Sequence, residues 1–185
     1  MDIDYNNREG RWYIPVVQVN ADLHLAQVIQ KSEKRLYDNL NIQRAKEGLE
    51  LINLEHNCFT NATTALKLFD GILFEYSYVE GYIIFSHNLT VQPHGWLQRD
   101  GESGECIILD PTLVKDGTVM NQPVIHYFPG LIFSLKDIKR KDFGYNINGK
   151  PTLPYYKNYG PDGTQNHSMR WAFKAAQAYR REALK

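Results

Sequence analysis

Three residues in the middle of the chain have side chains that can act together in acyl transfer: Cys58, His94 and Asp110. A thiolate is a nucleophile, an imidazolium can protonate a leaving amine, and a carboxylate can orient the imidazole through its far nitrogen. The sequence H-N-C-F-T-N-A-T-T-A-L-K-L-F-D-G predicts a helix that begins at Cys58, is capped by Asn57 and ends at Gly71. The unsatisfied N–H groups and the dipole at a helix start favour a thiolate and can stabilise an oxyanion.

The histidine and the aspartate belong to a second local pattern. The sequence V-Q-P-H-G-W-L-Q-R-D-G-E-S-G-E-C-I-I-L-D-P-T predicts two strands, His94–Gln98 and Cys106–Leu109, joined by a Gly-rich loop. Trp96 lies two residues after His94, so it shares a strand face with the imidazole and could shield it from water or contact the substrate. Asp110 ends the second strand. We therefore expect this hairpin to place an orienting acid beside a base.

Each of these residues also has an ordinary structural explanation. A cysteine at a helix start is often a packed small residue, a strand histidine is often a satisfied structural one, and Asp-Pro-Thr is a common turn. The three residues in this order, on these predicted elements, are more specific than any one of them alone. Cys106 lies within the apolar run C-I-I-L, which indicates a core position.

These pieces together resemble the transglutaminase-like branch of the papain-like cysteine enzymes. The matching motifs are N-C-F-T-N-A, Y-V-E-G-Y, H-G-W-L and I-L-D-P-T, within about residues 53–114 of the 185. Members of that superfamily carry cysteine, histidine and aspartate in this chain order. The resemblance implies a nucleophile at Cys58, a base at His94 and an acid at Asp110. It also implies a papain-like α+β core, in which the helix that bears the nucleophile packs against an antiparallel sheet.

The chain departs from the superfamily pattern at two positions. Gly95 follows the histidine where alanine is usual, and Glu80 precedes Gly81. A carboxylate at Glu80 could raise the pKa of a nearby cysteine, bind a cationic group of the substrate, or lie solvated on the far face. Asn57 or Asn53 could add a side-chain donor for the oxyanion, although capping alone explains Asn57 equally well.

The remaining patterns predict how the chain is organised around these motifs. We expect a single papain-like domain over 1–185, with a core at about 53–140, an N-terminal helical part at about 21–52 and a C-terminal helix at about 167–185. That helix should carry Trp171, Ala175 and Ala178 on one face. Further expectations are an edge strand over 11–19, a helix break near Asn39–Asn41 or Gly48, a strand bent at Gly81, and a turn at Pro129-Gly130. The order of these elements favours an α+β fold over a doubly wound one.

Composition excludes several classes of function. Lysine plus arginine is 21 and aspartate plus glutamate is 21, so the formal net charge is 0, which gives no general attraction to nucleic acid or to an anionic membrane. The basic C-terminal tail is better explained as a solvated helix face. No apolar run approaches the ~20 residues of a membrane span, and the N-terminus lacks the pattern of a signal peptide, so we expect a cytoplasmic protein with reduced cysteines.

No cofactor or metal is expected. The sequence contains no Gly-rich phosphate loop. Cys58, His94 and Asp110, with His56 as a fourth ligand, could hold zinc, but the paired spacings typical of zinc sites are missing.

The sequence therefore predicts a cysteine hydrolase or acyltransferase that acts on an amide, isopeptide or thioester bond through an acyl-enzyme. A protease-like or amidase-like reaction is preferred over a transglutaminase reaction. The substrate would be a protein, a peptide or a small amide, and the sequence sets no oligomeric state. The alternative is a catalytically silent protein-binding module on the same fold.

Overall fold

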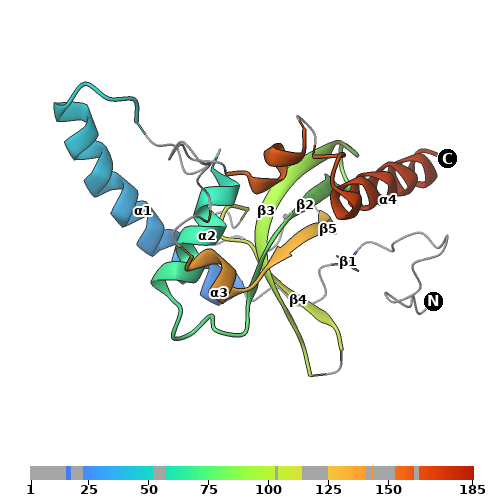
Figure 1. Ribbon diagram of the computed structural model, residues 1–185, viewed down its shortest axis with the longest axis horizontal. Coiled ribbons are helices and arrows are strands. Elements are labelled where there is room, and N and C mark those ends of the chain that lie inside the picture. The colour runs from blue at the N-terminus through green and yellow to red at the C-terminus, as the bar shows by residue number, and fades with distance from the viewer. Residues whose placement is uncertain are drawn as a thin grey trace.

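A computed structural model of the chain describes residues 16–17, 23–51, 57–102, 104–113, 125–140, 143, 153–160 and 163–185. Its helices are α1 (Leu23–Lys46), α2 (Cys58–Leu68), α3 (Leu135–Ile138), the 3-10 helix η3 (Tyr155–Tyr159) and α4 (His167–Ala183). Its strands are β1 (Val16–Val17), β2 (Ser77–Phe85), β3 (Val91–Asp100), β4 (Cys106–Leu109) and β5 (Ile125–Phe133). Helices surround an antiparallel sheet (Figure 1), so the expected α+β class is confirmed.

The strands form one sheet in the order β1-β5-β2-β3-β4, and each neighbouring pair is antiparallel. β1 lies at one edge, which confirms the expected edge strand for Val16–Val17; the rest of 11–19 lies outside the described residues. The two predicted strands around the Gly-rich loop pair as β3 and β4, with Leu97 opposite Leu109 and Asp100 opposite Cys106.

A β-bulge interrupts the pairing of β2 with β5 between Glu80 and Gly81, where the sequence predicted a bend; the bend of β2 itself stays a prediction. Glu80 pairs with Leu131 and Gly81 with Pro129, so Gly130 is the extra residue. The turn predicted at Pro129-Gly130 is wrong, since β5 runs straight through it. A bulge accommodates a proline and a glycine inside a strand because it interrupts the hydrogen-bond ladder there.

α1 is a single helix through Lys46, so the break predicted near Asn39–Asn41 is wrong. Asparagine in an exposed helix interior costs only a fraction of a kcal/mol, which the rest of the helix tolerates. The helix stops just before Gly48, whose φ of 69° is the left-handed conformation typical of a helix C-terminus. The alternative break point at Gly48 is therefore confirmed.

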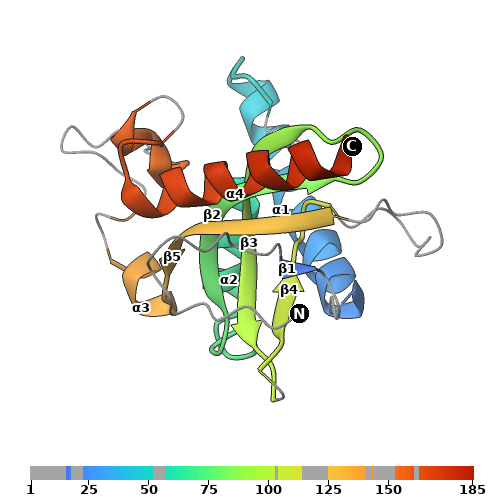
Figure 2. The same ribbon diagram turned by 90° about the vertical axis from the view of Figure 1, so that its right-hand side faces the viewer.

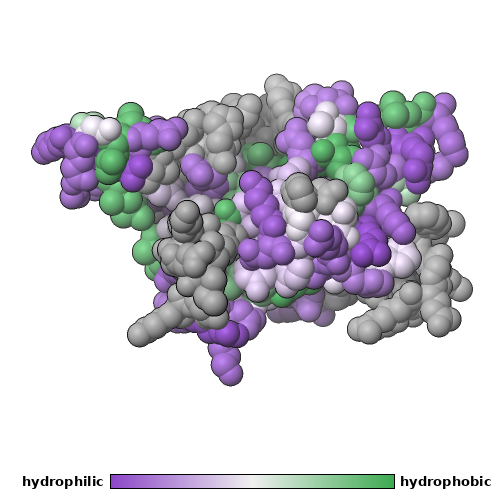
Figure 3. Space-filling view, turned by 45° about the horizontal axis from the view of Figure 1, so that its top comes forward, coloured by the Kyte–Doolittle hydropathy of each residue, from purple (hydrophilic) through white to green (hydrophobic). Residues whose placement is uncertain are grey.

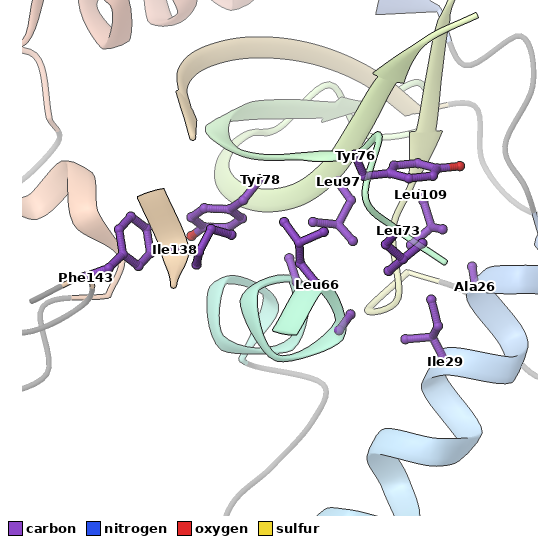
Figure 4. Packing of buried hydrophobic residues seen from close by; sticks show 12 residues of the cluster. Ala26, Ile29, Leu66, Leu73, Tyr76, Tyr78, Leu97, Leu109, Ile138 and Phe143 are labelled. Carbon is purple, nitrogen blue, oxygen red and sulfur yellow. The ribbon is translucent and has the colours of Figure 1, made fainter. Parts of the chain in front are cut away.

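α2 packs one face against the sheet. Its buried residues include Ala62, Ala65 and Leu66, each 0% exposed, whereas Phe69 is half-buried beyond the end of the helix. Figure 4 shows Leu66 of α2 pointing toward Leu97 of β3 within the cluster that also takes in α1. α2 ends at Leu68, earlier than the predicted Gly71. The position of its first turn is therefore fixed by a buried hydrophobic face.

α4 confirms the expected C-terminal helix and lies across β5 and β2 (Figure 2). The predicted inner face of Trp171, Ala175 and Ala178 is only partly right. The residues that are buried against the sheet are Met169, Ala172, Ala175 and Ala176. These are mostly small residues, which let the helix lie close to the strands.

The far end of α1 extends away from the sheet (Figure 1) and carries both charged and apolar side chains on its surface. Green and purple atoms are therefore mixed at the left end of the space-filling view in Figure 3. The exposed apolar residues in and just after this part of the chain are Leu36, Leu40, Ile42, Leu49 and Leu51.

Candidate active site

Cys58 is the first residue of α2, as predicted, and is half-buried. The Asn61 N–H donates to the Asn57 carbonyl at 2.8 Å and closes the first turn of the helix. The N–H groups of Cys58, Phe59 and Thr60 come before that bond, at the positive end of the helix. A thiol at this position lies beside backbone donors that can stabilise both a thiolate and an oxyanion.

Gly95 brings the first turn of α2 into contact with β3. A Cβ atom added at Gly95 would lie 2.8 Å from Phe59 Cδ1 and 3.0 Å from Phe59 Cα. The second of these is a backbone atom, so alanine could not be accommodated without moving the helix start. In this chain the glycine is therefore needed for the close approach of the nucleophile's helix to the histidine's strand.

His94 lies at a section of β3 that β4 does not cover. β4 pairs only with Leu97–Asp100. Because β4 ends at Leu109, the next residue, Asp110, lies beside the part of β3 that β4 leaves unpaired. His94 Nε2 and Asp110 Oδ2 are 2.7 Å apart, and both side chains are nearly buried. The expected contact between His94 and Asp110 is therefore present, and the roles of base and orienting acid stay predictions.

Asp110 is held by further donors. Its Oδ2 also accepts a hydrogen bond from the Tyr127 hydroxyl of β5 at 3.0 Å. Its Oδ1 accepts from the backbone N–H groups of Thr112 at 3.1 Å and Leu113 at 3.3 Å. These contacts fix the position of the carboxylate. The role of Tyr127 could not be predicted from the sequence, because this tyrosine lies on β5, whose strand partners local motifs do not reveal.

A second set of contacts joins Asp110 to the helices. Asn61 of α2 donates through Nδ2 to Thr112 Oγ1 at 3.1 Å, and its Oδ1 accepts from Tyr37 of α1 at 3.4 Å. Asn61 is 1% exposed. The turn after Asp110 is thus connected to α2 and, more weakly, to α1.

The environment of His94 favours its charged form. Burial lowers the pKa of His94, but the charge of Asp110 and hydrogen bonds to Asp110 and Cys58 outweigh it and raise the pKa from 6.5 to about 10. Because Nε2 is bound to Asp110, Nδ1 is the ring nitrogen left for the thiol. The arrangement is that of an imidazolium held between a carboxylate and a sulfur atom.

Trp96 covers the imidazole, as predicted, but it is not exposed to a substrate. Its side chain is 0% exposed, and its ring is nearly parallel to that of His94, with 6.4 Å between centroids. The indole Nε1 donates to Gln98 Oε1 at 3.2 Å. Trp96 therefore keeps water from one side of the imidazole, and the prediction that it contacts substrate has no support.

Glu80 is 0% exposed, so the expectation of a solvated residue is wrong. Its Oε1 accepts hydrogen bonds from the Tyr78 hydroxyl at 2.6 Å and the Tyr155 N–H at 2.7 Å, and Oε2 accepts from the Tyr156 N–H at 2.7 Å. Burial raises the pKa of Glu80, and these donors oppose that effect. The chain itself occupies both oxygens, which argues against a direct bond to a cationic substrate group.

Asn57 stands at the cap position of α2, but its side chain makes no capping hydrogen bond. The capping role predicted for it is wrong, because its backbone, with φ of −117° and ψ of 38°, is not in the usual extended cap conformation. Its role as an oxyanion donor stays a prediction. Asn53 and His56 lie outside the described residues.

Cys106 differs from Cys58 in its surroundings. It is a free thiol, half-buried against the cluster that contains Trp96 and Tyr127. Burial, followed by the charge of Asp100, raises its pKa from 9.0 to about 11. A thiol of this kind is a poor nucleophile near neutral pH, so Cys106 serves as an internal contrast to Cys58.

Among the described residues, no group of three or more His, Cys, Asp and Glu side chains could hold a metal ion. Within the same residues, no helix has both the length and the apolar character needed to cross a membrane. Comparison with protein-family models, curated proteins and solved structures found no match to the chain.

Proposed function

We propose that the chain is a papain-like cysteine hydrolase or acyltransferase that acts on an amide, isopeptide or thioester bond through Cys58, His94 and Asp110. The observation that carries this proposal is the buried 2.7 Å contact between His94 and Asp110, with the Cys58 thiol close enough to the same imidazole to help raise its pKa. The order of the three residues along the chain and the position of Cys58 at a helix start support it.

In the proposed reaction, the Cys58 thiolate attacks the substrate carbonyl and forms a C–S bond. The carbonyl oxygen becomes an oxyanion near the N–H groups at the start of α2. As the intermediate collapses, the C–N bond of an amide or isopeptide, or the C–S bond of a thioester, breaks, and the His94 imidazolium gives the leaving group its proton.

The second half of the reaction reverses these roles. Neutral His94 takes a proton from water as the water oxygen attacks the thioester, and the acid product leaves with the thiolate restored. Asp110 keeps the ring orientation through both halves, since its bond to Nε2 leaves Nδ1 directed to the thiol. We favour hydrolysis over transfer because transfer also requires a second substrate, an acceptor amine, and no binding site for that amine has been identified among the described residues. The substrate is a protein, a peptide or a small amide.

The test compares turnover of a peptide and amide library by the wild-type protein with turnover by variants of each triad residue. Cys58→Ala should abolish activity, and His94→Ala should lower kcat/KM by roughly 10²–10⁴-fold. Asp110→Asn should have a smaller effect. Cys106→Ala is the matched control, because it removes a thiol outside the site, and it should retain activity.

Full activity in Cys58→Ala would contradict the proposal. A protein that turns over nothing, but whose Cys58→Ala variant keeps the affinity of the wild type for a bound partner, would instead favour the binding module.

A further inference from the structure

Glu80 is a buried carboxylate that has no cationic partner among the described residues, and it is held by neutral donors. It is 0% exposed, and its recorded bonds come from the Tyr78 hydroxyl and from the N–H groups of Tyr155 and Tyr156. Burying a carboxylate is costly unless its oxygens are satisfied. Both oxygens of this buried carboxyl group are bound, so it holds the segment that supplies the backbone donors in place.

The segment held by Glu80 is η3. Tyr155 and Tyr156 are the first two residues of this short helix, so the carboxylate binds the N–H groups at its start. Those bonds span 75 and 76 residues of sequence. A carboxylate at a helix start satisfies donors that have no partner within the helix. Glu80 therefore attaches η3 directly to the central strand of the sheet.

η3 lies beside the nucleophile. The ring of Tyr156 contacts the ring of Phe59, the residue after Cys58, with 5.7 Å between centroids. Tyr156 is packed closely on its other side as well, because a Cβ atom at Gly163 would lie 2.8 Å from its Cδ2. Tyr78, which bonds Glu80, is close enough to Cys58 that a thiolate there contributes to raising the pKa of the tyrosine.

The part of the chain around this contact is aromatic. Phe59 and two residues of η3, Tyr155 and Tyr159, are half-buried, so each still has accessible surface. The rings of Tyr155 and Tyr159 are 6.1 Å apart. Aromatic surfaces of this kind bind apolar and aromatic groups, with a gain of up to about 1.5 kcal/mol per ring pair beyond the area that is buried.

We propose that Glu80 is a positioning residue of the site: it holds η3 as an aromatic wall next to Cys58, and the wall receives an apolar or aromatic side chain on the acyl half of the substrate. This inference rests on the proposed function, since the acyl group is the one transferred to Cys58. Glu80 acts through the backbone of Tyr155 and Tyr156 and does not touch the reacting atoms.

The test uses three thiol-directed probes with the full chain. Iodoacetamide reports the reactivity of Cys58 alone. The chloromethyl ketones of N-acetyl-phenylalanine and N-acetyl-alanine report which side chain the site prefers. We expect the wild type to react roughly 10-fold faster with the phenylalanine probe than with the alanine probe, the ratio that one good aromatic contact gives.

Glu80→Gln is the variant of choice, because it keeps the shape but directs an amide N–H₂ at a backbone N–H. We expect the probe ratio to fall to near 1, the amides of Tyr155–Tyr159 to exchange with deuterium faster, and the iodoacetamide rate at Cys58 to stay within about 2-fold. Glu33→Gln is the matched control, since Glu33 is also 0% exposed but lies on α1. It should leave the probe ratio unchanged.

If Glu80→Gln does not fold, Tyr78→Phe removes one donor to the carboxylate and should lower the ratio by about 3-fold. A wild-type Cys58 that does not react with iodoacetamide would contradict the proposed function, and this role of Glu80 with it. Two results with a reactive Cys58 would overturn the role of Glu80 alone. One is a probe ratio near 1 in the wild type; the other is a wild-type ratio that is unchanged in Glu80→Gln or Tyr78→Phe.

Discussion

Glu33 of α1 should make the protein less stable as the pH rises from 5 to 8. The residue lies on the buried stripe of the helix with Ala26, Ile29 and Tyr37. Its side chain is 0% exposed, and neither carboxyl oxygen has a hydrogen-bond partner among the described residues. Burial raises its pKa from 4.5 to about 8. The folded protein therefore keeps a proton on Glu33 at a pH where the unfolded chain has released it.

The sign and size of the effect follow from this difference. Below pH 4.5 Glu33 is protonated in both the folded and the unfolded state, so its ionisation does not change the free energy of unfolding. Between 4.5 and about 8, only the unfolded state ionises, so the free energy of unfolding falls by about 1.4 kcal/mol per pH unit. The loss reaches roughly 3 kcal/mol at pH 7, a large share of the stability of a single domain.

The assay is urea unfolding of the wild type and Glu33→Gln at several values between pH 5 and 8. Other groups titrate in both proteins and cancel in the difference between the two free energies of unfolding. That difference should shift by roughly 1.4 kcal/mol per pH unit in favour of Glu33→Gln. Glu47→Gln, at an exposed glutamate after the same helix, controls for the loss of one carboxylate. A difference that stays flat from pH 5 to 8 would refute the assignment of a buried, protonated Glu33.

Three further predictions concern the contacts around the triad. Tyr127→Phe removes a donor to Asp110 and should lower the free energy of unfolding by about 1–3 kcal/mol, and kcat/KM several-fold; an unchanged variant in both assays would show that the hydroxyl is not needed. Gly95→Ala should lower the free energy of unfolding by about 1–3 kcal/mol, and with it the melting temperature, and should slow the alkylation of Cys58, since the new Cβ meets the Phe59 backbone. A melting temperature and an alkylation rate equal to those of the wild type would contradict the close approach of α2 to β3. The raised pKa of His94 contributes stability that is complete below pH 6.5 and is lost as the pH rises toward about 10. The free energy of unfolding of the wild type should therefore exceed that of Asp110→Asn by less and less over that range. A difference between the two that is independent of pH would contradict the ion pair.

The elements that bear the triad could be predicted because their signals are local. A helix start at Cys58 follows from the polar-to-apolar change within a few residues, and β3 and β4 follow from short segments with apolar residues on either side of a Gly-rich loop. The contact between His94 and Asp110 then depends only on the pairing of two neighbouring strands, which a hairpin fixes. The resemblance to papain-like enzymes rests on the same local motifs, and for that reason it covers the part of the chain where the predictions hold best.

The contacts that the sequence could not give join distant segments. Tyr127 reaches Asp110 from β5, and the N–H groups that bind Glu80 come from η3, more than seventy residues later. Pro129-Gly130 suggests a turn in isolation, and only the bulge opposite Gly81 makes it part of a strand. A polar residue type says nothing about its partner until the fold brings the two together.

Alkylation of the native protein with iodoacetamide between pH 5 and 9, read by mass spectrometry at each cysteine, tests the proposed triad most directly. Cys106 is the internal reference, because its pKa is raised to about 11. The proposed triad predicts that Cys58 reacts much faster than Cys106 at pH 6, and that His94→Ala removes this advantage. A Cys58 that reacts no faster than Cys106 at pH 6, or equally fast without His94, would contradict a thiolate–imidazolium pair.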